Sequence, residues 1–335
     1  MRTLSVLALL AACAPAPVGF DEETDTDLPV DTGSETDTDT DADTDTDTDT
    51  DTDADTDADT DADTDADTDA DTDADTDADT DTDPNPATDF ALPGGRTVTT
   101  STGSAALTSC TMQYTNYEPN GGAVGPLVIL SHGFQRSQAE MVNWANHLGS
   151  YGLQVVTPSL CHASILDTDH AQNAQDLVEL ATSLSASEVI YVGHSAGGLA
   201  SYLAAAADNR TVAVFGLDPV DADLATGTNV TAPNAAVFGV AQQCNSNNNM
   251  VGFYDSELRI SDADHCDFEN PSGIICGFTC PNGGNTYSDE EIREVIGRQM
   301  TAFVLWHSGL DTTGEAWWQG AEYSDLLYSG RASAL

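Results

Sequence analysis

A long run of alternating aspartates decides which part of this chain can fold. From Asp37 to Asp83, Asp stands at every second position, with only Thr or Ala between. Such a segment offers no side chains from which a core could be built. Carboxylates about 7 Å apart repel one another, which favours an extended chain with a reach on the order of 150 Å. Residues 13–89 are therefore predicted to form a disordered acidic stalk, and folding is left to residues 90–335.

The carboxylates of the stalk raise the question of calcium binding. Calcium loops need a turn glycine and a bidentate acidic residue at fixed positions. The Asp/Thr/Ala repeat has neither, which favours a stalk with loosely associated counterions. Calcium binding stays open as the alternative.

The charge balance excludes some partners. The chain has 57 acidic residues and 8 basic residues, all of them Arg, for a net charge of −49. This composition excludes unaided binding to nucleic acid or to a bare anionic membrane. Residues 90–335 hold 25 acidic residues and 7 Arg, a net charge of −18. That charge is expected to disfavour anionic substrates near the surface, a penalty that salt should relieve.

The N-terminus has the pattern of an export signal. Met1 and Arg2 precede an apolar stretch from Leu4 to Ala12, too short to span a membrane. The sequence Leu10-Ala11-Ala12-Cys13 resembles the lipobox of bacterial lipoproteins. The resemblance implies that residues 1–12 are removed and that Cys13 carries lipid, anchoring the chain to the bilayer of the cell envelope, at the outer membrane or cell surface. A plain signal with an incidental cysteine is the alternative.

Six further cysteines remain for an exported domain, and an even number favours disulfides. Fifteen pairings are possible, and the sequence does not choose among them. A zinc site of Cys266, Cys276, Cys280 and His265 is the less favoured alternative, because an exported chain is more often bridged. The six are Cys110, Cys161, Cys244, Cys266, Cys276 and Cys280.

From Gly125 onward, short apolar runs alternate with amphipathic stretches. This pattern predicts one α/β domain with a mainly parallel sheet and helices on both faces. The expected strands are 127–130, 153–157, 189–192, 212–217 and 236–240, with residues 110–117 as an antiparallel edge pair. The expected helices are 137–150, 169–184, 197–207 and an acid-capped helix from Ser288 to about His307.

The sequence Gly193-His194-Ser195-Ala196-Gly197-Gly198 directly follows one expected strand and precedes a helix. G-x-S-x-G in this context predicts a nucleophile elbow, where a side chain at Gly193 or Gly197 would collide across the turn. Ser195 is the predicted nucleophile, and the Ala196 N–H is a predicted oxyanion donor.

A second oxyanion donor is expected in Ser131-His132-Gly133-Phe134, which follows the first parallel strand. The Phe134 N–H is the candidate. His132 and His194 are interpreted as structural residues that flank these backbone donors.

A serine nucleophile needs an imidazole to accept its proton. His265 is the predicted base, because it lies on a loop before the last helix. Folds built around a nucleophile elbow of this kind place the catalytic histidine there. His307 is interpreted as packing within that helix. His147, His162 and His170 precede the serine and are interpreted as surface or loop residues.

The acid is less narrowly defined. Asp218 in Leu217-Asp218-Pro219-Val220-Asp221 ends the strand after the serine and is the preferred candidate. Asp221 is the second candidate and Asp255 the third. A turn-capping role for Asp218 is the alternative.

Together the segments SHGF, GHSAGG, GLDPVD, and FYD followed by DADHCDF resemble the α/β-hydrolase superfamily, and within it the esterases similar to chlorophyllase and platelet-activating-factor acetylhydrolase. The resemblance covers roughly residues 125–310. It implies a Ser195, Asp218 and His265 triad with Phe134 and Ala196 as oxyanion donors. Chlorophyllases usually carry Arg and Lys near the elbow, where this chain has Ala196 and Leu199, so chlorophyll is not the expected substrate.

We therefore expect a monomeric serine esterase that acts on a small ester through an acyl-enzyme, without a metal or organic cofactor. A catalytically silent binding module with the same fold, and a peptidase or amidase using the same triad, are the alternatives. The substrate pocket is expected to be lined by the polar segments 226–233 and 242–251.

Overall fold

The computed structural model describes residues 88–273, 276, 280 and 283–335. The predicted signal, lipidation site and acidic stalk fall almost wholly within residues 1–87 and so lie outside the described residues. Phe90, the predicted first residue of the domain, is fully buried. No helix within the described part of the chain is long and apolar enough to cross a membrane.

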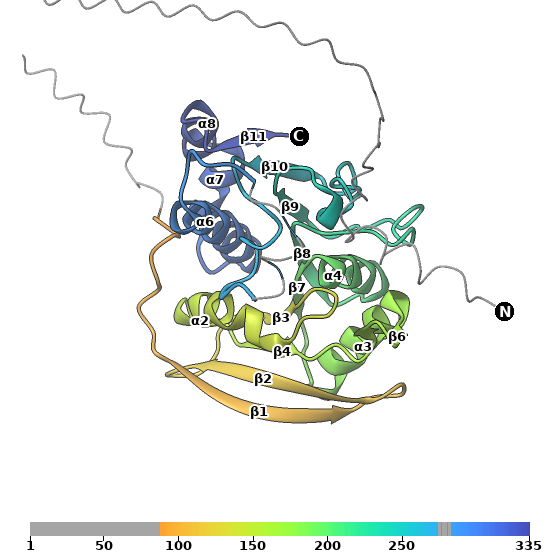
Figure 1. The fold of residues 1–335 in the computed structure, drawn as a ribbon. Coiled ribbons are helices and arrows are strands. Elements are labelled where there is room, and N and C mark those ends of the chain that lie inside the picture. Colours follow the sequence, from red (N-terminus) through yellow and green to blue (C-terminus); the bar gives the residue numbers. More distant parts are fainter. Residues whose placement is uncertain (1–87, 274–275, 277–279, 281–282) are drawn as a thin grey trace, which may run out of the picture. The chain divides into compact units, whose positions relative to one another are not determined.

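A nine-stranded sheet forms the centre of the described chain, with the order β1-β2-β4-β3-β7-β8-β9-β10-β11 (Figure 1). The strands from β4 to β10 are parallel, whereas β1, β2 and β11 pair antiparallel at the edges. Their bounds are β1 (Val98–Ala106), β2 (Thr111–Pro119), β3 (Leu127–Ser131), β4 (Val155–Pro158), β7 (Val189–His194), β8 (Thr211–Leu217), β9 (Asn234–Phe238), β10 (Ser256–Ile260) and β11 (Ala332–Ala334). A separate hairpin joins β5 (Ala163–Ser164) to β6 (Asp167–Thr168).

Helices cover both faces of this sheet, as Figure 1 shows for α2 and α6 on one side and α3 and α4 on the other. The helices and turns are η1 (Gln138–Met141), α2 (Val142–Ser150), α3 (His170–Ser183), α4 (Ala196–Ala207), η2 (Gln243–Asn245), α6 (Asp289–Ser308), η3 (Thr312–Glu315), α7 (Ala316–Gln319) and α8 (Ala321–Tyr328). Ser288 caps α6 through a reciprocal pair of hydrogen bonds with Glu291, as its acidic start predicts.

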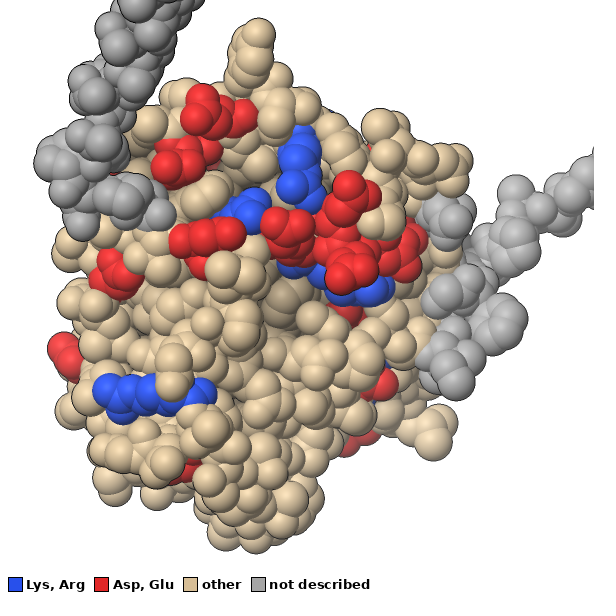
Figure 2. All heavy atoms as spheres, turned by 90° about the vertical axis from the view of Figure 1, so that its left-hand side faces the viewer, with Lys and Arg blue, Asp and Glu red and all other residues tan. Residues whose placement is uncertain are grey.

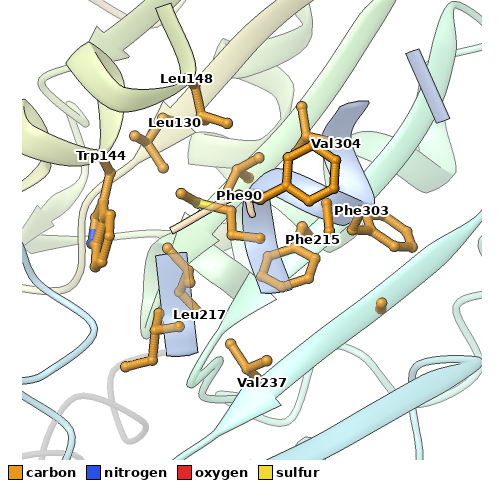
Figure 3. Close-up of a cluster of buried hydrophobic side chains, with 14 of the residues drawn as sticks. Phe90, Leu130, Trp144, Leu148, Phe215, Leu217, Val237, Phe303 and Val304 are labelled. Carbon is orange, nitrogen blue, oxygen red and sulfur yellow. The ribbon is translucent and has the colours of Figure 1, made fainter. Parts of the chain in front are cut away.

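The two faces of the sheet carry two separate cores because successive strand residues point in opposite directions. In β3, Val128 and Leu130 belong to the core under α2 and α6, whereas Leu127 and Ile129 belong to the core under α3 and α4. Figure 3 shows the first core, where Phe215 and Leu217 of β8 lie with Phe303 of α6. A strand buried on both faces has no polar alternation, which explains the continuous apolar runs in the sequence.

The predicted strands and helices are present, and their ends differ from the prediction by at most two residues. The α/β-hydrolase architecture is confirmed: a mostly parallel sheet with helices on both sides. The sequence interpretation missed the strands β1, β5, β6, β10 and β11 and the helices α7 and α8. The prediction of an antiparallel edge pair within residues 110–117 was wrong in its extent, because these residues belong to the single strand β2, which pairs with β1. Leu258 and Ile260 of β10 are buried in the same core as Phe215, and this places the loop after β10 at the carboxyl edge of the sheet.

Candidate active site

Ser195 stands at the turn between β7 and α4 in a strained backbone conformation, with φ 56° and ψ −127°. Its N–H donates to Leu217 O at 3.1 Å, and its own carbonyl accepts from Val220 N at 3.1 Å. The turn is therefore tied to the end of β8, directly beside Asp218. This is the strand-turn-helix context that the elbow motif predicts.

The glycines around Ser195 are required by close backbone approach. A β-carbon at Gly193 would lie 2.2 Å from Gly197 O, and one at Gly197 would lie 2.2 Å from His132 O. One at Gly133 would lie 3.0 Å from the Ser195 β-carbon. The elbow and the loop after β3 are thus pressed together, and only glycine fits between them.

Three of the predicted residues form one line of hydrogen bonds. Ser195 Oγ lies 2.9 Å from His265 Nε2, and His265 Nδ1 lies 2.6 Å from Asp218 Oδ2. All three side chains are buried, with Asp218 fully so. With Nδ1–H donating to the carboxylate, Nε2 is left as an acceptor for the serine hydroxyl. This arrangement can remove a proton from Ser195 and return it.

The other two candidate acids lie outside this line. Asp221 Oδ1 accepts from Leu224 N at 2.8 Å and Ala225 N at 3.1 Å, so it caps a turn. Asp255 is bonded to Asn234. The capping role that was the alternative for Asp218 thus belongs to Asp221.

Asp218 is held by two further donors that the sequence interpretation did not identify. Gly239 N donates to Oδ1 and Asn245 Nδ2 donates to Oδ2, each at 3.1 Å. Asn245 is fully buried and also donates to Val240 O at 2.9 Å. These donors stabilise a carboxylate that would be costly to bury alone.

The asparagine-rich segment 242–251 therefore differs from its prediction as a pocket wall. Asn245 braces Asp218, Asn248 donates to Gly239 O, and Asn249 bonds the main chain of Asp221 through both its amide atoms. The other predicted wall, 226–233, ends at Pro233 just before β9 starts. A parallel strand starts at the edge opposite to its carboxyl end, so this end of the segment lies away from Ser195.

Disulfides cross-link the loop that carries His265 and the loop that carries Asn245. Cys266, the residue after His265, pairs with Cys276, and Cys244, the residue before Asn245, pairs with Cys280. Cys110 pairs with Cys161 near the hairpin of β5 and β6. The alternative zinc site is not supported, because its three cysteines are engaged in bridges and His265 bonds Ser195 and Asp218. Within the described chain, the other group of close metal-ligand types also contains a disulfide, that of Cys110 and Cys161.

The loop after β3 is organised by His132. Its Nδ1–H donates to Gly133 O at 2.7 Å, and its Nε2 accepts from Leu160 N at 3.0 Å. Burial lowers the pKa of His132 to about 4, so the ring is neutral and bridges two loops. Its predicted structural role agrees with this geometry.

The two proposed oxyanion donors lie in the two backbone segments that meet at Ser195, the loop after β3 and the start of α4. Phe134 follows Gly133, which lies against Ser195, and its N–H has no acceptor among the described residues. Ala196 is the first residue of α4, and a helix leaves its first N–H groups without internal partners. Both N–H groups are therefore available near the nucleophile.

Two of the remaining histidines differ from their interpretation as surface or loop residues. His147 lies within α2 and bonds Phe90 O at 2.9 Å. His170 is the first residue of α3 and is buried, with its ring edge-on to Phe134 at 5.9 Å. His307 packs between Phe303 and Trp306 within α6, as predicted.

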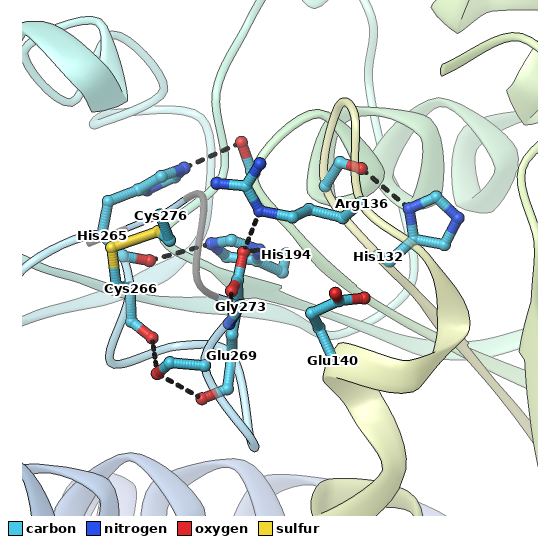
Figure 4. A network of polar contacts seen from close by, with 12 residues as sticks. His132, Arg136, Glu140, His194, His265, Cys266, Glu269, Gly273 and Cys276 are labelled. Atoms are coloured by element: carbon cyan, nitrogen blue, oxygen red, sulfur yellow. Dashed lines mark hydrogen bonds and ion pairs between the residues drawn. A yellow bond between two sulfur atoms is a disulfide. The ribbon is translucent and has the colours of Figure 1, made fainter. Parts of the chain in front are cut away.

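A buried network behind the triad was also missed (Figure 4). His194 Nε2–H donates to His265 O at 3.1 Å, and the two rings lie 4.5 Å apart. Burial lowers the pKa of His194 well below its usual range, and His265 and Arg136 act in the same direction. Glu269, fully buried, lies 4.0 Å from His194 Nδ1 and accepts from Arg136 Nε at 2.5 Å. Motif reading cannot find this network, because Arg136 and Glu269 lie 133 residues apart.

Comparison with known proteins agrees with this architecture. No match was found among curated proteins. Residues 128–275 match the model of the alpha/beta hydrolase family, and this range contains Ser195, Asp218 and His265. The matched range and the sheet order identify an α/β-hydrolase fold and support a hydrolase.

Proposed function

We propose that this protein is a serine-dependent carboxylic ester hydrolase that acts through an acyl-enzyme. The observation that carries the proposal is the continuous line from Ser195 Oγ through the His265 imidazole to Asp218, with distances of 2.9 and 2.6 Å. The same three residues could serve a peptidase or amidase, and a silent binding module would retain the elbow only as scaffold.

The first half of the reaction follows from this geometry. Ser195 Oγ attacks the ester carbonyl carbon while its proton passes to His265 Nε2. Asp218 accepts a hydrogen bond from Nδ1–H and stabilises the imidazolium. The tetrahedral oxyanion is bound by the N–H groups of Phe134 and Ala196. Collapse breaks the bond to the alcohol, which takes the proton from Nε2 and leaves an acyl-serine.

Water completes the cycle. His265 Nε2 removes a proton from water, whose oxygen attacks the acyl carbon, and the bond to Ser195 breaks as Oγ takes the proton back. The ester is split into an acid and an alcohol, and the enzyme is restored. His265 mediates every proton transfer of the cycle.

The decisive experiment labels the full chain with a fluorescent phosphonate, followed by assay with nitrophenyl esters of increasing chain length. Labelling that is absent in Ser195→Ala, together with ester turnover, supports the proposal. Circular dichroism of both proteins shows whether the variant is folded. Lack of labelling in a folded wild-type protein would favour the silent binding module, and amide turnover exceeding ester turnover would favour the peptidase.

We also propose that Cys13 carries lipid and holds the enzyme to the cell envelope, with residues 13–89 as spacer. The support is the sequence Leu10-Ala11-Ala12-Cys13 after a short apolar stretch. Growth with an alkyne-tagged fatty acid should label the wild-type protein and leave Cys13→Ser unlabelled. Equal labelling of both proteins would contradict the anchor.

A further inference from the structure

Arg136 lies next to the proposed oxyanion loop. Its N–H donates to Gly133 O at 3.2 Å, and this closes the turn that contains Phe134. The side chain is only 11% exposed. The loop leaves β3 at the carboxyl edge of the sheet, the edge where β7 delivers Ser195. Arg136 is thus a largely buried cation at the same edge as the nucleophile.

One end of the Arg136 guanidinium is fixed by the protein. Nε donates to Glu269 Oε1 at 2.5 Å, and Glu269 Oε2 accepts from Gly273 N at 2.7 Å. Both carboxylate oxygens of Glu269 therefore have donors, and the ion pair cannot rotate freely. Glu269 also lies 4.0 Å from His194 Nδ1, and the His194 ring is 4.5 Å from the His265 ring. Figure 4 shows the guanidinium of Arg136 at the same end of this network as His194 and His265.

The other end of the guanidinium is unpaired. Neither Nη1 nor Nη2 of Arg136 has an acceptor among the described residues. In the upper half of the face shown in Figure 2, the basic side chains lie among acidic ones, and two arginines of α6 show how such side chains are bonded. Arg298 Nη2 donates to Glu294 at 2.6 Å, and Arg293 Nη2 donates to Ser272 at 2.8 Å. Neither nitrogen of Arg136 is among the buried side-chain atoms without a partner, so both reach solvent and can accept an anion that arrives from it.

We propose that the Nη1 and Nη2 groups of Arg136 bind a carboxylate carried by the ester substrate. This inference rests on the proposed esterase function and names its substrate class: monoesters of dicarboxylic acids, or other esters with one free carboxylate near the scissile bond. Two parallel N–H groups on a planar fork match a carboxylate in bidentate geometry. A fixed Nε places that fork before the substrate arrives, which lowers the entropy cost of binding.

The negative net charge of the domain and the positive charge of Arg136 act on an anionic substrate in opposite directions and over different distances. The 25 acidic residues and 7 Arg of residues 90–335 repel anions at long range. A largely buried Arg acts at short range and is screened less by salt than the surface charges. Added salt should therefore raise turnover of a carboxylate ester by screening the repulsion, while the Arg136 contact is retained.

The test compares two nitrophenyl esters that differ in one charge. Mono(4-nitrophenyl) adipate has a free carboxylate, and methyl 4-nitrophenyl adipate is the neutral diester in which that carboxylate is methylated. In the full chain, Arg136→Gln should lower the ratio of kcat/KM for the monoanion to that for the diester by about 10- to 100-fold, the size expected for a charge-assisted hydrogen-bonded pair. Arg96→Gln is the matched control, because it removes one positive charge from a residue whose Nη1 bonds Gly122 O. That variant should leave the ratio unchanged.

A second variant guards against misfolding. Arg136→Gln leaves Glu269 buried without its ion partner, whereas Arg136→Gln combined with Glu269→Gln keeps the pair neutral. If Arg136 had a purely structural role, kcat/KM for the two esters would fall by the same factor. The ratio of the two kcat/KM values would then be unchanged in both variants. That result would overturn the inference.

Binding to Ser195→Ala separates this inference from the esterase proposal. Calorimetric titration with monomethyl adipate and dimethyl adipate needs no catalysis. Tighter binding of the monoanion by about tenfold, lost when Arg136→Gln is added, supports the carboxylate site even if the wild type hydrolyses neither nitrophenyl ester. Equal binding of both adipates overturns the site, while ester turnover by the wild type would still support the esterase.

Discussion

Asn245 donates a hydrogen bond to the same oxygen of Asp218 that accepts from His265. The two donors reach Oδ2 at 3.1 and 2.6 Å, so the carboxylate is fixed from both sides. Asn245 is itself oriented by Gln242, whose N–H donates to its Oδ1 at 2.8 Å. A polar loop residue thereby helps to fix the position of Asp218, the acid of the proposed triad.

Replacing this residue should reduce catalysis through Asp218. Asn245→Ala removes a charge-assisted hydrogen bond worth about 1.5–3 kcal/mol, so kcat should fall about tenfold or more. Asn249→Ala is the matched control, because Asn249 bonds the main chain of Asp221 and not the triad. Thermal unfolding and ester kinetics of both variants test this. A similar loss of kcat in both would show that the loop acts only through general stability.

The two aspartates of the segment Asp218-Pro219-Val220-Asp221 should behave differently. Asp218→Asn should lower kcat by about 10³- to 10⁴-fold, because an amide cannot stabilise the imidazolium or hold the required tautomer. Asp221→Ala should keep kcat near the wild-type value and lower the melting temperature, because two backbone donors lose their cap. Kinetics at a temperature well below both transitions measure the difference. A larger loss of kcat for Asp221→Ala would reverse the assignment.

The elbow should not accept even one added methyl group. Gly197→Ala would place a β-carbon 2.2 Å from His132 O, a backbone atom that cannot move aside cheaply. We expect a loss of about 1–3 kcal/mol or more in the free energy of unfolding, measured by urea denaturation. Gly95→Ala is the control, because its β-carbon would meet nothing within 4 Å. Equal stability of the two variants would contradict the close approach.

His132 should make stability fall at acidic pH. Its pKa is about 4 in the folded chain and near 6.5 when unfolded, so between these values the unfolded state binds the proton and the folded state does not. The stabilisation is complete above pH 6.5 and is lost as pH falls towards 4, at a cost of about 3 kcal/mol.

Urea denaturation at pH 7 and pH 5 tests this dependence with the disulfides intact. His132→Gln should be less stable than the wild type at pH 7, because the bridge from Gly133 O to Leu160 N is lost. Its stability should also change less between the two pH values. His147 and His170, whose pKa values burial also lowers, remain in both proteins and provide the shared background. An unchanged pH dependence in the variant would refute the role of His132.

The elbow and the triad could be predicted from the sequence because their signals are local or ordered along the chain. Gly193 and Gly197 are required by a turn of five residues, and chain order singles out His265. The sequence only ranked the acids Asp218, Asp221 and Asp255, and the fold distinguishes them through the bond from His265 to Asp218. The pairing of Arg136 with Glu269 joins residues 133 positions apart and has no periodic signature. Whether Asn245 would line a pocket or brace Asp218 depended on packing that composition does not encode. The disulfide pairing likewise depended on the fold.

Two disulfides adjoin the residues that align the triad, since Cys266 follows His265 and Cys244 precedes Asn245. While these thiols are reduced, neither loop is covalently fixed beside the nucleophile. If the proposed activity requires both loops to be fixed, the reduced chain is a latent precursor and closing the bridges activates it. Under the proposed export, a cell would then be protected from the enzyme until the chain has left the reducing compartment.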